Sequence, residues 1–284
     1  MTFLRNLSRI ELLDIAESVP NGPSTRELSR LAVENEIMIG AGLVEVGDDG
    51  EVYNTYVVTM PNGDHHSHRK LHCFISPHMR SGSQFLTFDT HQGWRIGVLT
   101  CYDCNLPENA RMVALKGAHL LLAPHQTGGF YFPGRHGMGV IEQQLWDNRR
   151  NDPAAIEAEF RGEKGREWIM TWLPARAYDN GMFLVFSNGV GLDGNEIRTG
   201  NSMILDPYGR ILAETDKAQD DLVVAQLDPS LLDKTYGRMF IRTRRPELYT
   251  PLTDRTLRND IDERIVSGTT GFDPDEYKNL MRRV

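Results

Sequence analysis

The sequence predicts a single α/β domain, and three observations support this prediction. Strand patterns and helix patterns are mixed throughout the chain rather than occupying separate halves, which favours one domain of sheets covered by helices. Hydrophobic residues make up 40% of the 284 residues, enough for a large core. No internal repeat, low-complexity tract or clear linker divides the chain. We therefore expect one domain over residues 1–230, followed by a tail over 231–284 with short helices.

The composition argues against several kinds of partner. The formal net charge is −8 at pH 7 and the pI is about 5.6. Because no segment concentrates lysine and arginine without acidic neighbours, we expect neither nucleic acid nor an anionic membrane as a partner. No apolar run reaches the roughly 18 residues of a membrane span. The chain shows no secretory signal, and its three cysteines form no disulfide framework. We therefore expect a cytoplasmic protein.

The first part of the chain predicts two helices and then two strands. Ser8 and Glu11 have the spacing of a capping box, at the start of a helix to about residue 17. Ser24 and Glu27 repeat this spacing before a second helix, to about residue 35. The strands predicted next, from β-compatible and alternating patterns, cover residues 37–44 and 51–60.

The remaining domain alternates strands with helices. Helical patterns cover residues 106–116 and most of 153–178, with a glycine-rich break at 162–165. Turn residues separate the apolar runs that predict the other strands. These strands are expected at 84–90, 94–100, 119–123, 182–187, 201–205, 210–214 and 222–227.

Cys101 is the strongest candidate for a catalytic group. It follows an apolar run and precedes a helical pattern, so it stands at a strand-to-helix turn. At such a turn the sulfur lies at the sheet edge, beside backbone N–H groups that favour the thiolate. Lys70 follows a strand pair that should bring it to the end of the sheet, although a lone lysine can also be a solvated surface charge. The N–H of Tyr102 is a candidate oxyanion donor.

Two other types of chemistry are compatible with parts of this region. Cys101 and Cys104 form a C-x-x-C pair, which in a redox protein would form a reversible disulfide. Here the helix is expected to start after the second cysteine, unlike in thioredoxin-type pairs. A dense group of histidines could bind zinc, but no paired Cys/His spacing accompanies it, so we expect exposed turn histidines and no metal ion. These histidines are His65, His66, His68, His72 and His78.

Several segments, in order along the chain, resemble the motifs of one enzyme family. Residues 97–103, with Pro107 and Glu108, resemble the nucleophile motif of the nitrilase superfamily of carbon–nitrogen hydrolases. Residues 69–72 resemble its lysine motif. The segments similar to its other motifs are 42–45 with 53–55, 175–181 and 202–212. One such match would be weak, but matches in the family's order, up to about residue 230, are specific.

The resemblance implies a fold, a reaction and site residues. The implied fold is an α-β-β-α sandwich, and the implied site is a Glu–Lys–Cys triad without a metal or another cofactor. By residue matching, Cys101 is the nucleophile and Lys70 is the catalytic lysine. Glu45 falls on an accessory position, where it is expected to hold Lys70 by a hydrogen bond; a role as catalytic base is the alternative.

The glutamate of the triad has no counterpart in the sequence. The family carries it in a Pro-Glu motif at the end of an early strand, and this chain has no such motif before its first predicted strand. We therefore expect the fold to lack the family's first strand, first helix and second strand. The two hypotheses are a sequence that starts late and a genuine short form that is inactive.

Other departures from the family's motifs bear on the substrate. Some members clamp a substrate carboxylate with two arginines where this chain has Cys104 and Asn105, so recognition of N-carbamoyl amino acids by that route is not expected. His78 lies near the place of a second glutamate of many relatives, and its charge would respond to pH near neutrality. His125 and Gln126 begin a glycine-rich loop of the kind that lines pockets, unless its glycines serve only turns.

These expectations combine into one function and one alternative. The function is hydrolysis of a non-peptide C–N bond in a small amide, carbamoyl compound or nitrile, through a thioester on the cysteine. The alternative is a catalytically impaired binding or scaffold protein, because the triad glutamate is missing. The resemblance further implies a homodimer or larger homo-oligomer, in which residues 231–284 could contact a neighbouring copy.

Overall fold

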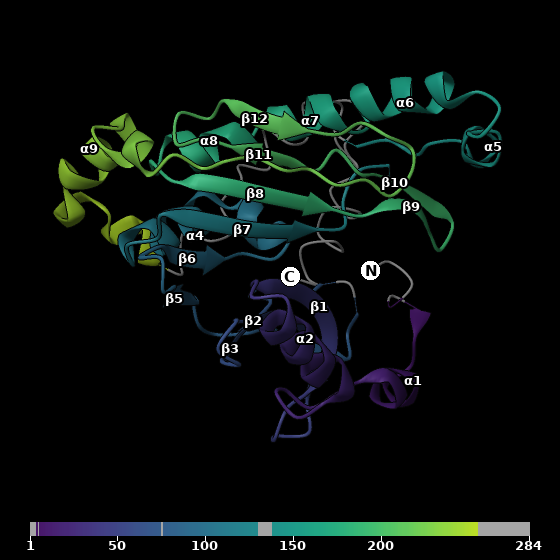
Figure 1. The fold of residues 1–284 in the computed structure, drawn as a ribbon, viewed down its shortest axis with the longest axis horizontal. Coiled ribbons are helices and arrows are strands. Elements are labelled where there is room, and N and C mark those ends of the chain that lie inside the picture. The colour runs from purple at the N-terminus through teal and green to yellow at the C-terminus, as the bar shows by residue number, and fades with distance from the viewer. Residues whose placement is uncertain (1–3, 5, 75, 130–137, 255–284) are drawn as a thin grey trace.

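Two β-sheets lie against each other in the chain, with helices on their outer faces (Figure 1). The computed structural model describes residues 4, 6–74, 76–129 and 138–254. In this part of the chain, one sheet has six strands and the other has four, and a short hairpin forms a third unit. The hairpin strands are β9 (Val190–Asp193) and β10 (Glu196–Thr199).

The six-stranded sheet has the order β12-β11-β8-β7-β6-β5. Its strands are β5 (Thr87–Asp89), β6 (Arg95–Val98), β7 (Leu120–His125), β8 (Phe183–Asn188), β11 (Met203–Leu205) and β12 (Ile211–Glu214). The three central strands, β6, β7 and β8, run parallel, whereas the outer pairs are antiparallel. β6 and β11 are buried along nearly their whole length and have the continuous apolar runs of strands covered on both faces, whereas the edge strand β12 alternates half-buried and exposed residues. The sequence predicted a strand at all six places.

The four-stranded sheet comes from the N-terminal third of the chain. Its strands are β1 (Ile39–Val46), β2 (Val52–Thr59), β3 (His65–Arg69) and β4 (Met79–Arg80). β2 pairs antiparallel with β1 and β3, and parallel with the short β4. β3 was not predicted, because its sequence, His-His-Ser-His-Arg, has no apolar alternation. Backbone pairing with the apolar β2 and burial of the His68 side chain hold it in place.

The helices cover the two sheets from outside. α1 (Arg9–Ile15) and α2 (Pro23–Glu34) pack on the four-stranded sheet. α4 (Pro107–Leu115) and α8 (Leu173–Tyr178) pack on the six-stranded sheet. The other helices are α3 (Tyr102–Asn105), α5 (Gln143–Asp147), α6 (Pro153–Arg161), α7 (Arg166–Met170) and α9 (Tyr236–Arg242), with 3₁₀ turns at Pro229–Leu232, Pro246–Leu248 and Thr250–Thr253. Within the described ranges, no helix combines the length and the apolar character needed to cross a bilayer.

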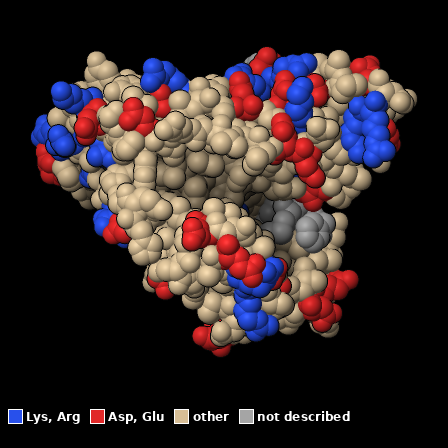
Figure 2. All heavy atoms as spheres, in the orientation of Figure 1, with Lys and Arg blue, Asp and Glu red and all other residues tan. Residues whose placement is uncertain are grey.

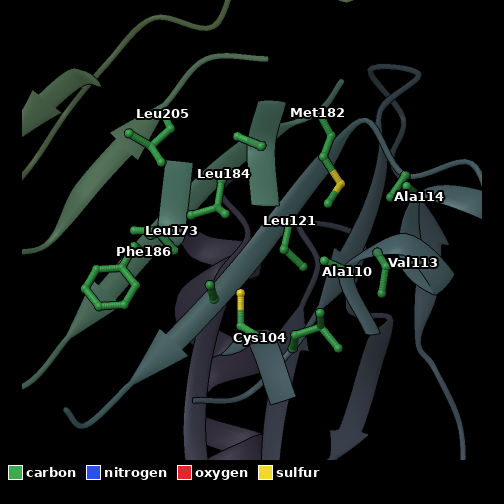
Figure 3. Packing of buried hydrophobic residues seen from close by; sticks show 14 of the residues in the cluster. Cys104, Ala110, Val113, Ala114, Leu121, Leu173, Met182, Leu184, Phe186 and Leu205 are labelled. Carbon is green, nitrogen blue, oxygen red and sulfur yellow. The ribbon is translucent and has the colours of Figure 1, made fainter. Parts of the chain in front are cut away.

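The core has two main layers, one on each face of the six-stranded sheet. Toward the helices, Leu121 and Leu184 pack with Cys104 and Val113 (Figure 3). Toward the other sheet, Val58 of β2 joins strand residues of the six-stranded sheet in a second cluster. α4 approaches β6 closely at Gly97, where a Cβ would lie 2.1 Å from Val113 Cγ1, so a larger residue there would push the helix away.

Three expectations about local structure were wrong. Ser24 does not cap α2: the N-cap is Gly22, and the Ser24 N–H and hydroxyl donate to the Glu17 carboxylate at 2.7 Å each. Residues 222–227 form no strand, because no neighbouring strand pairs with them, and Leu222 is exposed. A helical turn, α3, begins at Tyr102, between the two cysteines rather than after them. The capping box of Ser8 and Glu11 is confirmed.

Candidate active site

The candidate site lies at the carboxyl ends of the parallel strands. Cys101 follows β6, and His125 is the last residue of β7, the next strand in the sheet. The ends of parallel strands are where α/β folds place reacting groups, because the loops that follow them are free to form a crevice. Lys70 reaches this edge from the opposite sheet, since it directly follows β3.

Cys101 is held in an unusual backbone conformation. Its φ of 53° and ψ of −118° lie outside the regions that side chains other than glycine ordinarily adopt. The conformation persists because the surrounding groups hold the turn: the Cys101 N–H donates to the Pro124 carbonyl at 2.8 Å. Two side chains also hold the backbone of α3. Asn109 donates to the Asp103 carbonyl at 2.9 Å, and Arg176 donates to the Cys104 carbonyl at 2.9 Å. Such retained strain is typical of functional positions.

The Cys101 thiol is activated by its surroundings. The residue is partly exposed, whereas Cys104 is fully buried. Desolvation alone would raise the pKa of the Cys101 thiol, but His125, Lys70 and the Gln126 N–H outweigh it, and the pKa falls from 9.0 to about 6. A thiol with that pKa is mostly thiolate at neutral pH, which is the form that attacks carbon.

Lys70 is buried next to the turn that carries Cys101. Its side chain is only 3% exposed, and its Nζ donates to the Thr100 carbonyl at 3.3 Å. The same Nζ lies 3.7 Å from Asp103 Oδ1 and 5.3 Å from the centre of the Phe74 ring. A buried ammonium needs a compensating anion, so the carboxylate of Asp103 and the thiolate of Cys101 together account for its presence.

Asp103 lies in the motif of residues 97–103, but the sequence predicted no role for it. It is completely buried and accepts N–H bonds at 2.9 Å each from Leu71 and His72, with a further 2.9 Å contact to His72 Nδ1. Burial alone would raise the pKa of this carboxyl, but Lys70, His68, His72 and the Leu71 N–H hold it far below its usual value. The only signal in the sequence was its place two residues after Cys101.

Glu45 is placed beside Arg69 rather than beside Lys70. Its carboxylate accepts from Arg69 Nη2 at 2.6 Å and Nε at 3.1 Å, and from the Thr55 hydroxyl at 2.5 Å. Both oxygens are therefore engaged in tying β1, β2 and β3 together. The arrangement positions the backbone of the lysine segment through the residue that precedes Lys70.

The structure places the other predicted contact residues in different surroundings. The Tyr102 ring packs edge-on against His72 and Phe74, with centroids 5.9 and 5.4 Å apart. Gln126 offers its backbone N–H to the thiol, while its side chain donates to Asp193 Oδ2 at 3.2 Å. His78 is exposed, and its N–H donates to the Ser76 hydroxyl at 3.3 Å. A substrate contact from any of them stays a prediction.

The geometry bears on the redox and metal-binding alternatives at Cys104 and at the dense histidines. The Cys104 side chain points into the helix-side core (Figure 3), and burial raises the pKa of its thiol to about 12, so it is poorly suited to exchange with Cys101. In the described ranges, no three His, Cys, Asp or Glu side chains are grouped to hold a metal ion. Of the dense histidines, His68 and His72 face Asp103, and His66 stacks on Phe88.

The surface has a hollow and a separate cavity. Figure 2 shows a hollow between the upper and lower parts of the molecule, lined mainly by residues other than Lys, Arg, Asp and Glu. Charged side chains of both signs lie around it. A different cavity, of about 650 Å³, lies near α5 and α6 and is lined by Trp146, Arg149 and Lys217 among others. Neither Cys101 nor Lys70 lines that cavity, so the reactive groups are elsewhere.

Comparisons with known proteins agree with this geometry. The family model described as "Carbon-nitrogen hydrolase" matches residues 6–236. "Probable nitrilase C965.09" of Schizosaccharomyces pombe is 29% identical over 243 residues, covering 83% of this chain and 76% of that protein. "Omega-amidase NIT2" of Mus musculus is 28% identical over 251 residues, covering 84% and 78%. A carbon–nitrogen hydrolase structure from Helicobacter pylori G27 superposes with a TM-score of 0.70 at 23% identity, covering 90% of this chain and 83% of that one. The chain therefore belongs to the carbon–nitrogen hydrolase family.

Proposed function

We propose that this protein hydrolyses a non-peptide C–N bond in a small amide, carbamoyl compound or nitrile. The activated thiol of Cys101, beside the buried ammonium of Lys70, is the observation that carries the proposal. The names of two similar proteins, a probable nitrilase and an omega-amidase, support the same class of reaction.

For an amide, the reaction has two halves. The Cys101 thiolate attacks the carbonyl carbon, and the oxyanion that forms is stabilised by Lys70 and by backbone N–H groups at Tyr102 and Gln126. The C–N bond then breaks and ammonia or an amine leaves, while the acyl group stays on sulfur as a thioester. Water attacks the thioester, the C–S bond breaks, and the acid product leaves.

In this proposal Glu45 has a structural role. Both of its oxygens are occupied by Arg69 and Thr55, so it is not free to accept a proton from the thiol. It stabilises the β1–β2–β3 region that carries Lys70. The reaction still needs a group that moves protons between sulfur, water and the leaving nitrogen.

An ammonia-release screen tests the proposal. Purified protein is offered primary amides of increasing length, ω-amides of dicarboxylic acids, N-carbamoyl compounds and aliphatic nitriles, with the Cys101→Ala variant as the matched control. We expect release by the natural protein only, and an acyl adduct on Cys101 in mass spectra of quenched reactions. Release at equal rates by both proteins would overturn the proposal.

The scaffold alternative predicts an ordinary cysteine at this position. If the fold served binding alone, iodoacetamide would label Cys101 no faster than an unperturbed thiol. The lowered pKa of Cys101 favours the enzyme, because binding alone does not require a thiol that ionises near neutral pH.

We also propose that copies of the chain associate through the α8–α9 face. Tyr178, Tyr236 and Phe240 form a ring cluster there with centroid separations of 6.3–6.4 Å, and all three are exposed. Exposed aromatic clusters of this kind are typical of protein interfaces. Light scattering should find a dimer or larger assembly that Phe240→Ser shifts toward the monomer. A monomer at all concentrations would contradict this.

A further inference from the structure

The cavity of about 650 Å³ lies apart from the reactive groups. Residues of α5, α6, the start of β9 and the segment after β12 form its wall. Its volume falls in the range of about 300–1,000 Å³ in which proteins bind small molecules. Neither Cys101 nor Lys70 belongs to the wall, so the proposed hydrolysis gives this cavity no task. Figure 2 shows Lys and Arg side chains gathered at the end of the molecule where Figure 1 places α5.

Arg149 is held in a fixed orientation at this wall. The residue is half-buried, its guanidinium carbon lies 3.9 Å from the centre of the Trp146 ring, and its Nη1 donates to the Trp146 carbonyl at 2.8 Å. The Trp146 ring packs in turn on the backbone of β9, where a Cβ at Gly191 would lie 2.9 Å from it. A planar guanidinium that is already stacked on a ring loses little further freedom when it binds a ligand.

The positive charge of the wall is only partly neutralised. Neither Arg149 nor Arg150 has a carboxylate partner among the described residues, whereas the Lys217 ammonium lies 3.6 Å from the Glu157 carboxylate. With Asp220, the wall carries three cations and two carboxylates, in a chain whose net charge is −8. Two neighbouring guanidinium groups without a carboxylate therefore favour an anionic occupant.

Another part of the wall is apolar. Val190, Pro153 and Ala218 line the cavity beside the Trp146 ring, and Ala218 is buried in the same hydrophobic cluster as Trp146. Guanidinium groups bind carboxylate or phosphate oxygens through parallel N–H bonds, but these four side chains offer apolar contacts. An occupant that fits both parts has an anionic head and an apolar body.

We propose that this cavity is a second ligand site, which binds a small organic anion with its head on Arg149 and Arg150 and its body against Val190 and Ala218. The head is an oxyanion, either a carboxylate or a phosphate monoester. The site is separate from the one at Cys101, and its ligand does not depend on the proposed hydrolysis.

Isothermal titration calorimetry with phenyl phosphate and with benzoate tests the site, and neutral benzyl alcohol is the matched probe. We expect saturable binding of at least one of the two anions with a Kd of about 1 mM or tighter, and no binding of the alcohol at the same concentrations. The tighter of the two anions identifies the class of head group. Failure of both anions to bind, or equal binding of the alcohol, would overturn the proposal.

Substitution of the two arginines locates the bound anion. Arg149→Gln and Arg150→Gln should each weaken binding by about tenfold or more. The matched control is Arg26→Gln on α2, which removes an exposed guanidinium that donates to the Asn21 carbonyl at 2.6 Å and should leave the affinity unchanged. Thermal unfolding checks that each variant folds, and Arg149→Lys, which keeps the charge but lacks the planar fork, is the second variant and should also weaken binding. Equal affinity in all four variants would contradict the assignment.

Alkylation of Cys101 separates this site from the candidate active site. Protein that has been treated with iodoacetamide until Cys101 is fully modified should bind the anion with unchanged affinity, because Cys101 is not part of the cavity wall. Loss of binding after alkylation would place the anion at Cys101 and overturn the second site. None of these measurements uses ammonia release, so a failure of the hydrolase proposal leaves their outcome unaffected.

Discussion

The two cysteines of one helical turn show how differently the fold treats the same side chain. Cys101 and Cys104 stand three residues apart, and the Cys104 N–H donates to the Cys101 carbonyl at 2.8 Å. The first lies at the edge of the sheet, near an ammonium and an imidazole, and its thiol pKa is lowered to about 6. The second points into the apolar cluster between the sheet and α4, and its thiol pKa is raised to about 12.

Position, rather than residue type, sets the pKa of each thiol in this turn. Both thiols are desolvated, and desolvation by itself raises the pKa of each. Only at Cys101 do charged and polar groups exceed that penalty. The turn therefore carries one thiol whose surroundings favour the thiolate, Cys101, and one that packs in the core, Cys104. Each can be substituted separately.

Among substitutions in and around this turn, Cys101→Ala is expected to have the largest effect on hydrolysis. Hydrolysis should fall by about 10⁴-fold or more, because every step passes through sulfur. The melting temperature should change little, since the backbone conformation at this position is already strained for any side chain. Ammonia release and thermal unfolding measure the two quantities. Substantial turnover in a pure sample of the variant would mean that Cys101 is not the nucleophile.

Selective labelling compares the reactivity of the three cysteines in the natural protein. At pH 7 iodoacetamide should modify Cys101 at least about 10²-fold faster than Cys104 or Cys73, since burial raises the pKa of both other thiols. The folded pKa of Cys101 lies below its usual 9.0, so the stability due to its thiolate is complete above about pH 9 and is lost as pH falls through about 6. Peptide mapping reads the rates; equal rates at the three cysteines would contradict the assignment.

Asp103→Asn tests whether this carboxylate holds Lys70 and the Cys101 turn in place. The substitution leaves the Lys70 ammonium without its carboxylate and sets an amide against two N–H donors, so unfolding should become easier by about 3–5 kcal/mol at pH 7. Because the folded pKa of Asp103 is lowered, its stabilising effect is full above the usual 3.8 and decreases as pH falls below it. Urea unfolding at pH 7 and pH 3 should therefore show a smaller difference in acid.

Glu45→Gln is the matched control for that experiment. Glu45 is also a buried carboxylate, but its partner Arg69 has a side chain that is 37% exposed, and we expect a loss of only about 1–2 kcal/mol. If the two variants lost equal stability, the special position of Asp103 would be wrong.

The smallest effect on turnover is expected from Cys104→Ser, in the core. A hydroxyl buried among Leu121, Ala110 and their neighbours has no partner, which should cost about 1–3 kcal/mol of stability. Turnover per folded molecule should stay within about twofold. A large loss of kcat with unchanged folding would show that Cys104 takes part in the chemistry, as a redox pair would require.

Much of the fold could be predicted from local sequence. Apolar runs identified all six strands of the larger sheet, and helical periodicity identified α4, because burial on both faces or on one side leaves a pattern in the residues themselves. β3 and the hairpin β9–β10 were missed, since their pairing depends on a partner strand rather than on their own composition. For residues 222–227 the error is the opposite one: their pattern suited a strand, but they pair with no strand of the described structure.

Contiguous motifs of the sequence were enough to predict the strand-to-helix turn at Cys101, to single out Lys70 as a candidate partner and to indicate the family to which the chain belongs. Only the tertiary structure decided which groups surround the thiol. The parallel pairing of β6 and β7 brought His125 to Cys101, and the contact between the two sheets brought Lys70 to Asp103. His125 is 24 positions from Cys101 in the chain, and Asp103 is 33 positions from Lys70. Electrostatic effects between such groups depend on distances of a few ångströms, which packing sets and no local sequence pattern indicates.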